Sequence, residues 1–193
     1  MYEVFLSKVN EKVPLTPQEE AEIVSHLTLK TLRKRQIFLQ EGDICRYIAL
    51  VEKGTLRTYV TDLEGHEHIT AFALEGWSLG DLCSFLREEP ATQNIEALED
   101  CELCLISRPA HEELLLKMPK YETYNRILIT EAYIALQKRT RDMISLSPDE
   151  QYKAFVNVYP NIVQRVPQHM IASYLGLTPE TLSRIKSRIS QHK

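Results

Sequence analysis

The chain of 193 residues is long enough for one large domain or two small ones. Hydrophobic residues make up 44% and charged residues 26%, which is typical of a globular protein with an extensive core. No apolar run approaches the roughly 18–20 residues needed to cross a bilayer. The first twenty residues also lack the basic and apolar segments of a signal peptide. These features exclude a membrane partner and predict a cytoplasmic protein.

The net charge of −4 is unevenly distributed along the chain. Residues 161–193 contain a single acidic side chain, Glu180, against five basic ones: Arg165, Arg184, Lys186, Arg188 and Lys193. The preceding residues are acidic overall. A basic segment beside an acidic body indicates that the segment meets a polyanion while the body has another role. A basic final helix that is merely solvated is the alternative.

The first predicted element is a helix over residues 17–27, because Thr16, Pro17 and Glu19 form a capping box with proline at the first helical position. From Leu29 to Ser107 the pattern changes to short runs of β-branched and aromatic residues, such as QIFLQ, RYIALVE and GTLRTYVT. Turns such as EGD, EKG and DLEG separate these runs. Regularly spaced strands of this kind predict an antiparallel sandwich or barrel.

Two groups of side chains have spacings that suggest a metal site. Cys101 and Cys104 form a CxxC pair, but they lie in a predicted strand, where residues three apart point to opposite faces. We interpret them as half-buried strand residues. His66 and His68 share one face of a strand and supply at most two ligands, so an exposed hairpin is expected there. The sequence predicts no metal and no catalytic residue.

A short helix to Met118 and then a long helix follow the strands. The long helix runs from about residue 121 to residue 146, or about 39 Å at 1.5 Å per residue. Two apolar stripes run along this helix, and each must be buried against another surface. We expect one to pack on the β domain and the other on a second copy of the chain. One intramolecular core for both stripes is the alternative. The stripe assigned to the dimer contains Ile129, Ala132, Leu136 and Met143, continues to Leu146, and is broken only by Arg139.

The C-terminal stretch PQHMIASYLGLTPETLSRIKSRI contains two helices separated by Gly176. Glycine tolerates a positive φ and so ends the first helix, residues 167–175, in a sharp turn. Thr178 caps the second helix, and Pro179 takes its first position. A short helix, a tight turn and a second helix with an exposed face are typical of a helix-turn-helix motif. A helical hairpin used only for packing is the alternative.

The exposed face of the second helix carries the residues predicted to read bases: Glu180, Ser183 and Arg184. Arginine can bond guanine O6 and N7 in a fork, and glutamate can accept from cytosine N4. Contacts to the DNA backbone give affinity without sequence information. We assign these contacts to Arg165, Thr178, Thr181, Lys186, Ser187 and Arg188.

A β-rich domain, a long helix and a C-terminal helix-turn-helix, in this order, resemble the CRP/FNR family of bacterial transcription regulators. The match is most specific at LGLTPETLSRIKS, where ETLSR resembles the FNR-like recognition helix, although Pro179 replaces a position that is often polar. The resemblance implies that Glu180, Ser183 and Arg184 read an inverted repeat with half-sites similar to TTGA. It also implies a homodimer on double-stranded DNA, with RNA polymerase as a further candidate partner. Family members usually have a two-stranded wing after the recognition helix, for which residues 185–193 leave no room.

A second match concerns the β domain, where EGWSLGDLCSF and ATQNIEALE resemble the family's cyclic-nucleotide cassette. The family has Gly-Glu-Leu followed by Arg-Ser-Ala, but Ala91 stands here in place of the phosphate-binding arginine. An alanine cannot neutralise a phosphate, so we expect no cAMP in the usual mode and no other cofactor. An unknown small-molecule effector, if one exists, would occupy a pocket lined by Trp77, Gly80, Asp81, Leu82, Ala91 and Thr92.

The sequence therefore predicts an α+β protein in three parts. Residues 1–118 form an antiparallel jelly-roll, or double-stranded β-helix, similar to cyclic-nucleotide-binding domains. Residues 119–146 form a dimerisation helix, and residues 147–193 form an all-α helix-turn-helix domain. The predicted function is sequence-specific regulation of transcription, without enzymatic activity. Two alternatives remain: a ligand sensor whose helical tail binds a protein, and a cupin-like enzyme, which needs three or four converging metal ligands.

Overall fold

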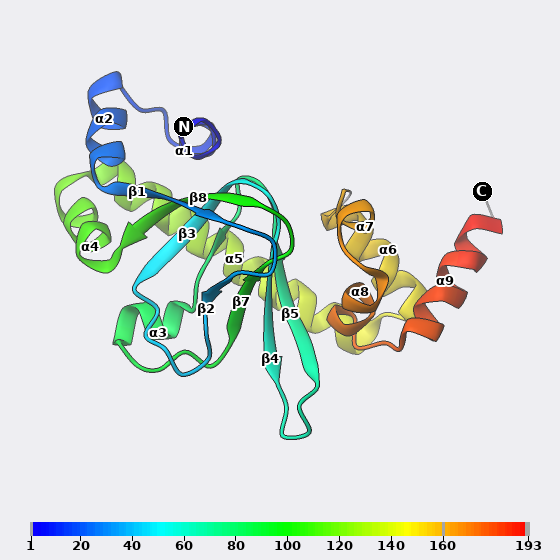
Figure 1. Cartoon of the computed structure of the whole chain (residues 1–193). Helices are drawn as coiled ribbons and strands as arrows, with labels where there is room; N and C mark the ends of the chain where they lie inside the picture. Colours follow the sequence, from blue (N-terminus) through cyan, green and yellow to red (C-terminus); the bar gives the residue numbers. More distant parts are fainter. Residues whose placement is uncertain (1, 160, 192–193) are drawn as a thin grey trace. The chain divides into compact units, whose positions relative to one another are not determined.

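The structure is a computed structural model that describes residues 2–159 and 161–191. The chain divides into two compact units (Figure 1). The first contains Met1–Val60 and Ala71–Thr130, and the second contains Thr61–Thr70 and Glu131–Lys193. This division differs from the predicted boundaries after residues 118 and 146, because it falls inside the long helix and groups the end of a β-hairpin with the C-terminal helices.

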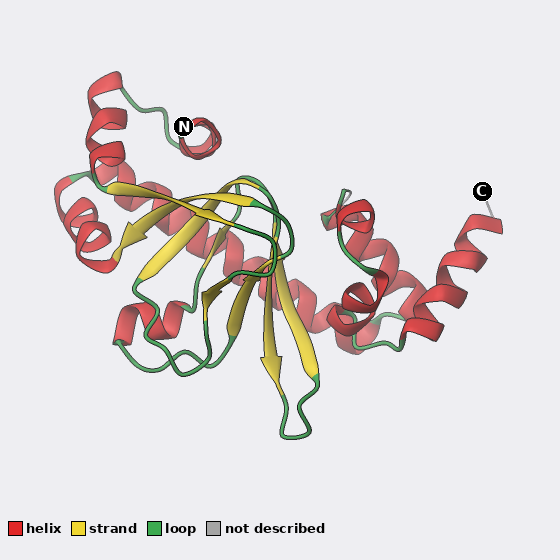
Figure 2. Ribbon diagram, in the orientation of Figure 1, coloured by secondary structure: helices red, strands yellow, loops and turns green. Residues whose placement is uncertain are grey.

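Two four-stranded sheets form the β-sandwich, as predicted (Figure 2). One sheet has the order β1-β8-β3-β6 and the other has the order β2-β7-β4-β5. The paired strands of known register, β1 with β8, β3 with β6 and β8, and β7 with β2 and β4, are antiparallel. The strands are β1 (Leu27–Leu32), β2 (Ile37–Leu39), β3 (Tyr47–Lys53), β4 (Leu56–Thr61), β5 (Glu67–Ala73), β6 (Ser78–Leu79), β7 (Asn94–Ala97) and β8 (Cys101–Ser107).

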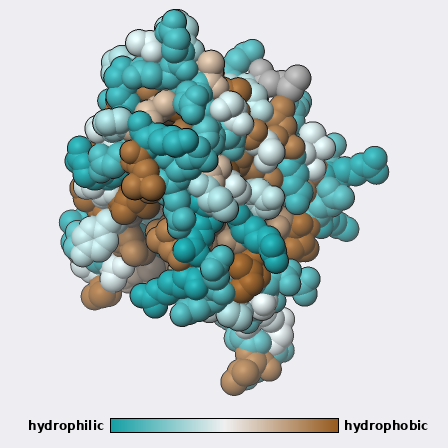
Figure 3. All heavy atoms as spheres, turned by 90° about the vertical axis from the view of Figure 1, so that its left-hand side faces the viewer, coloured by the Kyte–Doolittle hydropathy of each residue, from teal (hydrophilic) through white to brown (hydrophobic). Residues whose placement is uncertain are grey.

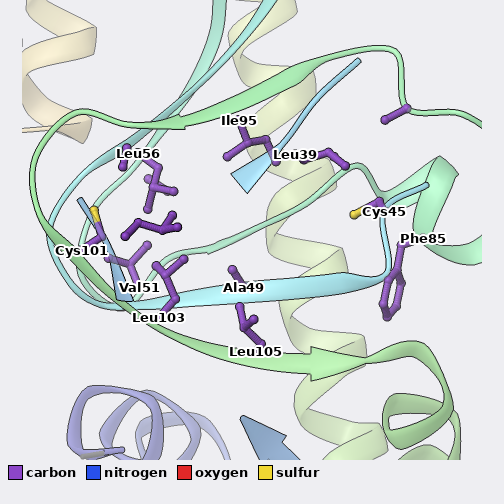
Figure 4. Packing of buried hydrophobic residues seen from close by; sticks show 14 residues of the cluster. Leu39, Cys45, Ala49, Val51, Leu56, Phe85, Ile95, Cys101, Leu103 and Leu105 are labelled. Carbon is purple, nitrogen blue, oxygen red and sulfur yellow. The ribbon is translucent and has the colours of Figure 1, made fainter. Parts of the chain in front are cut away.

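The main core lies between the two sheets (Figure 4). Val51 and Leu103 come from one sheet, Leu56 and Ile95 come from the other, and all four are fully buried. Alternate residues of each strand point to this core because side chains alternate between the faces of a sheet. The same alternation separates the two cysteines of the CxxC pair, since Cys101 belongs to this core and Cys104 to the cluster on the opposite face. Both are fully buried, which corrects the expectation that they are half-buried.

Helices cover the outer face of the β1-β8-β3-β6 sheet. They are α1 (Glu3–Lys12), α2 (Pro17–Ser25), α4 (Arg108–Lys117) and the first turns of α5 (Pro119–Ser145). Thr16 and Glu19 form the predicted capping box of α2. Helix α2 ends at Ser25 rather than at residue 27, because Leu27 begins β1 and pairs with Ile106. On the face of the molecule seen in Figure 3, most side chains are hydrophilic and the apolar ones are scattered.

The C-terminal helices of the second unit pack around a core of their own. They are α6 (Pro148–Val158), α7 (Ile162–Arg165), α8 (Gln168–Tyr174) and α9 (Pro179–Gln191). Ser147 and Glu150 form a capping box at the start of α6. The core contains Tyr152, Phe155, Ile162, Ile171, Ala172, Leu182 and Ile185, each buried. None of the helices in the two described ranges is long and apolar enough to cross a membrane.

The structure contains helices that the sequence pattern did not predict: α1, α7 and α3 (Leu82–Arg87). Tyr2, the N-cap residue of helix α1, makes no side-chain cap hydrogen bond; instead the backbone N–H groups of Val4 and Phe5 donate to the Glu52 carboxylate, at 3.1 and 2.7 Å. A cap that comes from a distant strand leaves no local sequence signal. Helices α3 and α7 have only 6 and 4 residues, too short for a visible helical period.

Candidate nucleic-acid interface

The turn between α8 and α9 has the predicted geometry. Gly176 adopts φ +66°, in the left-handed region that glycine occupies without strain. The Leu177 N–H donates to the Ala172 carbonyl oxygen at 2.9 Å and closes the end of α8. The Thr178 hydroxyl accepts from the Thr181 N–H at 3.2 Å and caps α9. The backbone therefore reverses within a few residues, and hydrogen bonds satisfy the Ala172 carbonyl at the end of α8 and the Thr181 N–H at the start of α9.

Small and branched side chains hold the two helices together. Ala172 on α8 and Leu182 and Ile185 on α9 have no solvent-exposed surface. The side chain of Ala172 is a single methyl group, which leaves room for α9 to pack against α8. These three residues fix one face of α9 against the unit, so the opposite face is left to solvent.

That opposite face carries the predicted base-reading residues. Glu180, Ser183 and Arg184 are all exposed. A shallow depression is lined by Thr181, Ser183, Arg184, Ser187 and Arg188. At 3.6 residues per turn, Glu180, Arg184 and Ser187 follow one another along the middle of this face.

The charge of Glu180 is stabilised at the start of the helix. Its own backbone N–H, the Thr178 hydroxyl and the Arg184 guanidinium lower the pKa of the Glu180 carboxyl below its ordinary value. A carboxylate near a helix N-terminus is favoured by the exposed N–H groups and by the helix dipole. Glu180 is therefore an acceptor at neutral pH, as recognition of a cytosine amino group requires.

The residues predicted to contact the DNA backbone have different positions. Thr181, Ser187 and Arg188 share the exposed face with Arg184, whereas Lys186 lies half-buried on its flank. Arg165 is the last residue of α7 and is half-buried. The remaining predicted contact, Thr178, forms the helix cap. The sequence analysis did not foresee Asp149, whose carboxylate accepts from the Arg188 guanidinium at 2.8 Å.

A second exposed feature is an apolar face on α5 between Ile129 and Ile144. The four residues assigned to dimerisation, Ile129, Ala132, Leu136 and Met143, are exposed. Leu136 has 59% and Ile144 83% of its surface in solvent. At about 100° per residue, Tyr133, Thr140 and Ile144 lie on the same side as Leu136. The apolar face is centred on these residues, and it excludes Arg139 and the half-buried Leu146, which corrects the predicted stripe.

In the β unit, Asp81 is buried and bonded to its own cassette. Its carboxylate accepts from the Ser84 N–H at 3.0 Å, as the N-cap of α3, and from the Thr92 N–H at 3.1 Å. The Thr92 hydroxyl lies 3.4 Å from the same carboxylate. Ala91 is buried beside it, with its N–H bonded to the Asp43 carbonyl oxygen at 2.8 Å. Asp81 thus joins the two halves of the cassette by hydrogen bonds within the protein.

Of the other residues assigned to an effector pocket, one lies beside the hydrogen bonds of Asp81 and two are exposed. Gly80 lies against Ile48, since a Cβ at this position would approach the Ile48 Cδ1 atom to 2.4 Å. Trp77 and Leu82 are exposed, and the Trp77 carbonyl oxygen accepts from the Val51 N–H on the turn that precedes β6. The structure therefore brings Gly80, Asp81, Ala91 and Thr92 together but leaves Trp77 41% and Leu82 45% exposed.

The residues considered for metal binding do not form a site. Among the residues that the structure describes, no group of three or more His, Cys, Asp or Glu side chains could hold a metal ion. His68 and His66 are exposed, and the hydrogen bond from His68 lowers the pKa of Asp62 to about 2. Burial raises the pKa of the Cys101 thiol to about 11 and that of Cys104 to about 12, so both are protonated at neutral pH.

Comparison with known proteins supports the fold and the motif. The cyclic nucleotide-binding domain family matches residues 29–118. The chain is 30% identical over 182 residues to the regulatory protein HlyX of Actinobacillus pleuropneumoniae, across 84% of this chain and 71% of that protein. It is 26% identical to the anaerobic regulatory protein of Haemophilus influenzae and spans 66% of its length.

Solved structures have the same fold. FixK2 from Bradyrhizobium japonicum superposes with a TM-score of 0.74 at 20% identity, over 86% of this chain and 85% of that chain. The catabolite activator protein of Thermus thermophilus superposes with a TM-score of 0.60 at 21% identity, over 96% of this chain and 87% of that chain. A double-sheet domain, a long helix and a C-terminal helix-turn-helix are the fold that this chain shares with them.

On the identity and coverage of the match to HlyX, the chain belongs to the CRP/FNR family. It is a transcription regulator, as the sequence analysis predicted, and not an enzyme. Family members bind DNA and usually act as dimers.

Proposed function

We propose that this chain binds double-stranded DNA sequence-specifically through α9, as a homodimer on an inverted repeat with half-sites similar to TTGA. The observation that carries the proposal is the exposed face of α9, where a capped helix start is followed by Ser183, Arg184, Ser187 and Arg188. Glu180, Ser183 and Arg184 read base edges, and Thr181 and Ser187 contact phosphates beside them. DNA as the ligand also places the protein in the cytoplasm.

Arg188 contacts a phosphate in competition with Asp149. Its guanidinium lies 2.8 Å from the Asp149 carboxylate, and 60% of the Arg188 side chain is exposed. An exposed ion pair contributes little to stability, about 0–1 kcal/mol. Exchange of this partner for a DNA phosphate therefore costs little, and Arg188 retains its role in binding.

The dimer forms through the apolar face of α5. Ile129, Leu136, Met143 and Ile144 are large apolar side chains that are about half exposed or more, which is unusual for neighbouring residues on one helix face. Pairing with the same helix of a second copy covers them with a two-fold symmetric seam. A symmetric dimer presents two α9 helices to half-sites about 34 Å apart, one turn of DNA.

Selection of duplexes from a random-sequence pool by the purified chain tests DNA recognition. We expect enrichment of an inverted repeat, and binding that weakens steeply as salt rises, because phosphate contacts release counterions. A chain that enriches no duplex at low ionic strength contradicts the proposal. Salt-independent binding to a protein partner would instead support the alternative of a sensor with a protein-binding tail.

Sedimentation of the variant Leu136→Arg tests the dimer. A charge at the centre of the α5 face is expected to shift the protein to monomer at concentrations where the parent is dimeric. Leu116→Arg is the matched control, since Leu116 is also exposed but lies on α4. If both variants keep the parental sedimentation coefficient, α5 does not carry the dimer.

Cyclic nucleotides are not effectors of this chain in our proposal. Asp81 already accepts from two backbone N–H groups, and Ala91 provides no cation for a phosphate. Thermal unfolding with excess cAMP or cGMP provides the test, because a ligand at 100 times its Kd stabilises by about 2.7 kcal/mol. We expect an unchanged Tm with either nucleotide. A rise with either one would restore the cassette as a nucleotide site and leave no need for another small-molecule effector.

A further inference from the structure

The second unit contains a contact between the helix-turn-helix and the edge of a β-sheet. Strand β5 is the last strand of its sheet, so one side of its backbone has no strand partner among residues 2–159 and 161–191. The Ile69 N–H donates to the Ser173 hydroxyl oxygen at 3.0 Å, and the same hydroxyl donates to the Glu67 carbonyl oxygen at 3.3 Å. One side chain of α8 thus satisfies two backbone groups of an edge strand, a position that proteins otherwise protect or pair.

Arg139 of α5 adds a second connection at the same place. Its guanidinium donates to the Thr70 carbonyl oxygen and, at 3.4 Å, to the Tyr174 carbonyl oxygen. It also lies 4.0 Å from the centroid of the Tyr174 ring, a cation–π distance. The planar guanidinium can make these contacts together, which an ammonium cannot. Arg139 therefore joins three elements: α5, β5 and α8.

The aromatic core continues this connection into the unit. The Tyr174 ring lies 5.2 Å from the ring of Phe155 and 6.0 Å from that of Tyr159, between ring centroids. Both partners are buried. Tyr174 is therefore held by Arg139 on one side and by the rings of Phe155 and Tyr159 on the other. The end of α8, to which Tyr174 belongs, has little freedom to move.

The position of these contacts along the chain gives them a consequence for α9. Ser173 and Tyr174 are the last two residues of α8, directly before the Gly176 turn. Helix α9 is packed on α8 through fully buried side chains, and a close-packed contact transmits displacement rather than absorbing it. Contacts that hold the end of α8 in place therefore also determine the direction in which the axis of α9 points.

Two other observations fit this role. Arg139 interrupts the predicted apolar stripe of α5, and its contacts explain why a cation stands there. Thr70, whose carbonyl oxygen accepts from Arg139, has a buried side-chain hydroxyl with no hydrogen-bond partner among the described residues. Such an orphan has an energetic cost. The strand is held at this residue by its backbone and not by its side chain.

We propose that Arg139 and Ser173 are positioning residues for DNA recognition: they fasten the end of α8 to the edge of β5 and thereby hold the recognition helix α9 in its binding direction. The proposal rests on the proposed function of α9 as a reader of DNA. Neither side chain needs to touch DNA. They restrict the orientations of α9 in the free protein, so that less conformational entropy is lost when α9 binds DNA.

The test uses the full chain and duplexes enriched by the parent protein from a random pool. Arg139→Ala and Ser173→Ala each remove one connection, and we expect each to weaken binding to the enriched duplex about tenfold. Binding to a duplex of scrambled sequence, which depends mainly on phosphate charge, should change much less. Ser173→Thr keeps the hydroxyl and should restore binding.

Two matched controls separate positioning from loss of charge or of folding. Lys138→Ala removes a cation from the neighbouring, exposed position of α5 and should leave specific binding unchanged apart from a small salt-dependent part. Thr70→Val keeps the shape of the side chain and the Thr70 carbonyl oxygen, and removes only the orphan hydroxyl. We expect it to bind at least as tightly as the parent.

Hydrogen exchange of the DNA-free protein provides a readout that does not depend on DNA. In Arg139→Ala and Ser173→Ala, the amides of α8 and of residues 67–70 should exchange faster, while those of β3 and β8 keep the parental rate. If the parent binds no duplex, the proposed function fails. Faster exchange in these variants would then still show that Arg139 and Ser173 hold the end of α8 to β5. Unchanged exchange, or faster exchange with unchanged or tighter specific binding, overturns the proposal.

Discussion

The two units of this chain direct their polar groups in opposite ways. In the β unit they bond to the protein itself: Asp81 to the backbone of its own cassette, Glu52 to the start of α1, and Arg57 to Glu96. In the C-terminal unit, α9 directs Arg184 and its neighbours to solvent, and α5 exposes an apolar face. Polar groups buried in bonds within the protein stabilise the fold, and exposed polar groups are accessible to a ligand.

The comparison is sharpest for two acidic residues that each stand at a helix start. Asp81 is 5% exposed and caps α3. Glu180 is exposed in the first turn of α9, with its carboxyl pKa lowered by its own N–H, by Thr178 and by Arg184. Both positions favour a carboxylate through the helix N-terminus. Burial commits the first to structure, and exposure leaves the second available to a base.

The largest effects are expected from cavities in the two cores. Leu103→Ala in the sandwich and Leu182→Ala under α9 both truncate fully buried side chains and should each cost about 2–5 kcal/mol of unfolding free energy. Leu103→Ala should destabilise the β unit, and Leu182→Ala should release α9 and abolish specific DNA binding. Denaturant unfolding with far-UV circular dichroism measures the change in each variant. Exposed Leu116→Ala is the control; equal loss in all three would contradict the assignment of these cores.

Local signals were sufficient for much of the fold. The capping box at Thr16 and the glycine turn at Gly176 involve residues close in sequence, and both were predicted. The site on α9 follows from the same local rules. The contacts of Arg139 and the start of α1 could not be predicted in this way. Arg139 bonds to Thr70 and Tyr174, and α1 bonds to Glu52, all of them far away in the chain. Long-range partners leave no periodic pattern in the sequence.

Arg184→Ala is expected to weaken specific binding by about 1–3 kcal/mol and to relax the preference at one base pair. The reason is the loss of a forked pair of hydrogen bonds from the guanidinium to guanine. Binding curves on the enriched duplex and on its single-base variants measure both effects. An unchanged preference at every position would show that Arg184 contacts only the backbone.

Asp81→Asn is expected to destabilise the β unit by about 1–2 kcal/mol, since an amide has one acceptor oxygen where the carboxylate uses two. DNA binding at a temperature where the unit stays folded should be unaffected. Asp43→Asn, an exposed residue of the same unit, serves as the control. Thermal unfolding separates the two variants. Equal Tm values for them would mean that the Asp81 cross-link contributes nothing to the cassette.

An effect of similarly small size is expected at the turn before the recognition helix. A Cβ at Gly176 would meet no atom within 4 Å, so Gly176→Ala adds only the cost of a left-handed φ, about 1–2 kcal/mol. Gly176→Asn should cost less, because asparagine tolerates this conformation better. If strain alone matters, the loss of DNA affinity in the two variants follows their loss of stability. A larger loss of affinity in Gly176→Ala, with little change in Tm, would instead mean that the turn has opened and turned α9 away from its direction, the same defect that release of Arg139 or Ser173 is expected to produce.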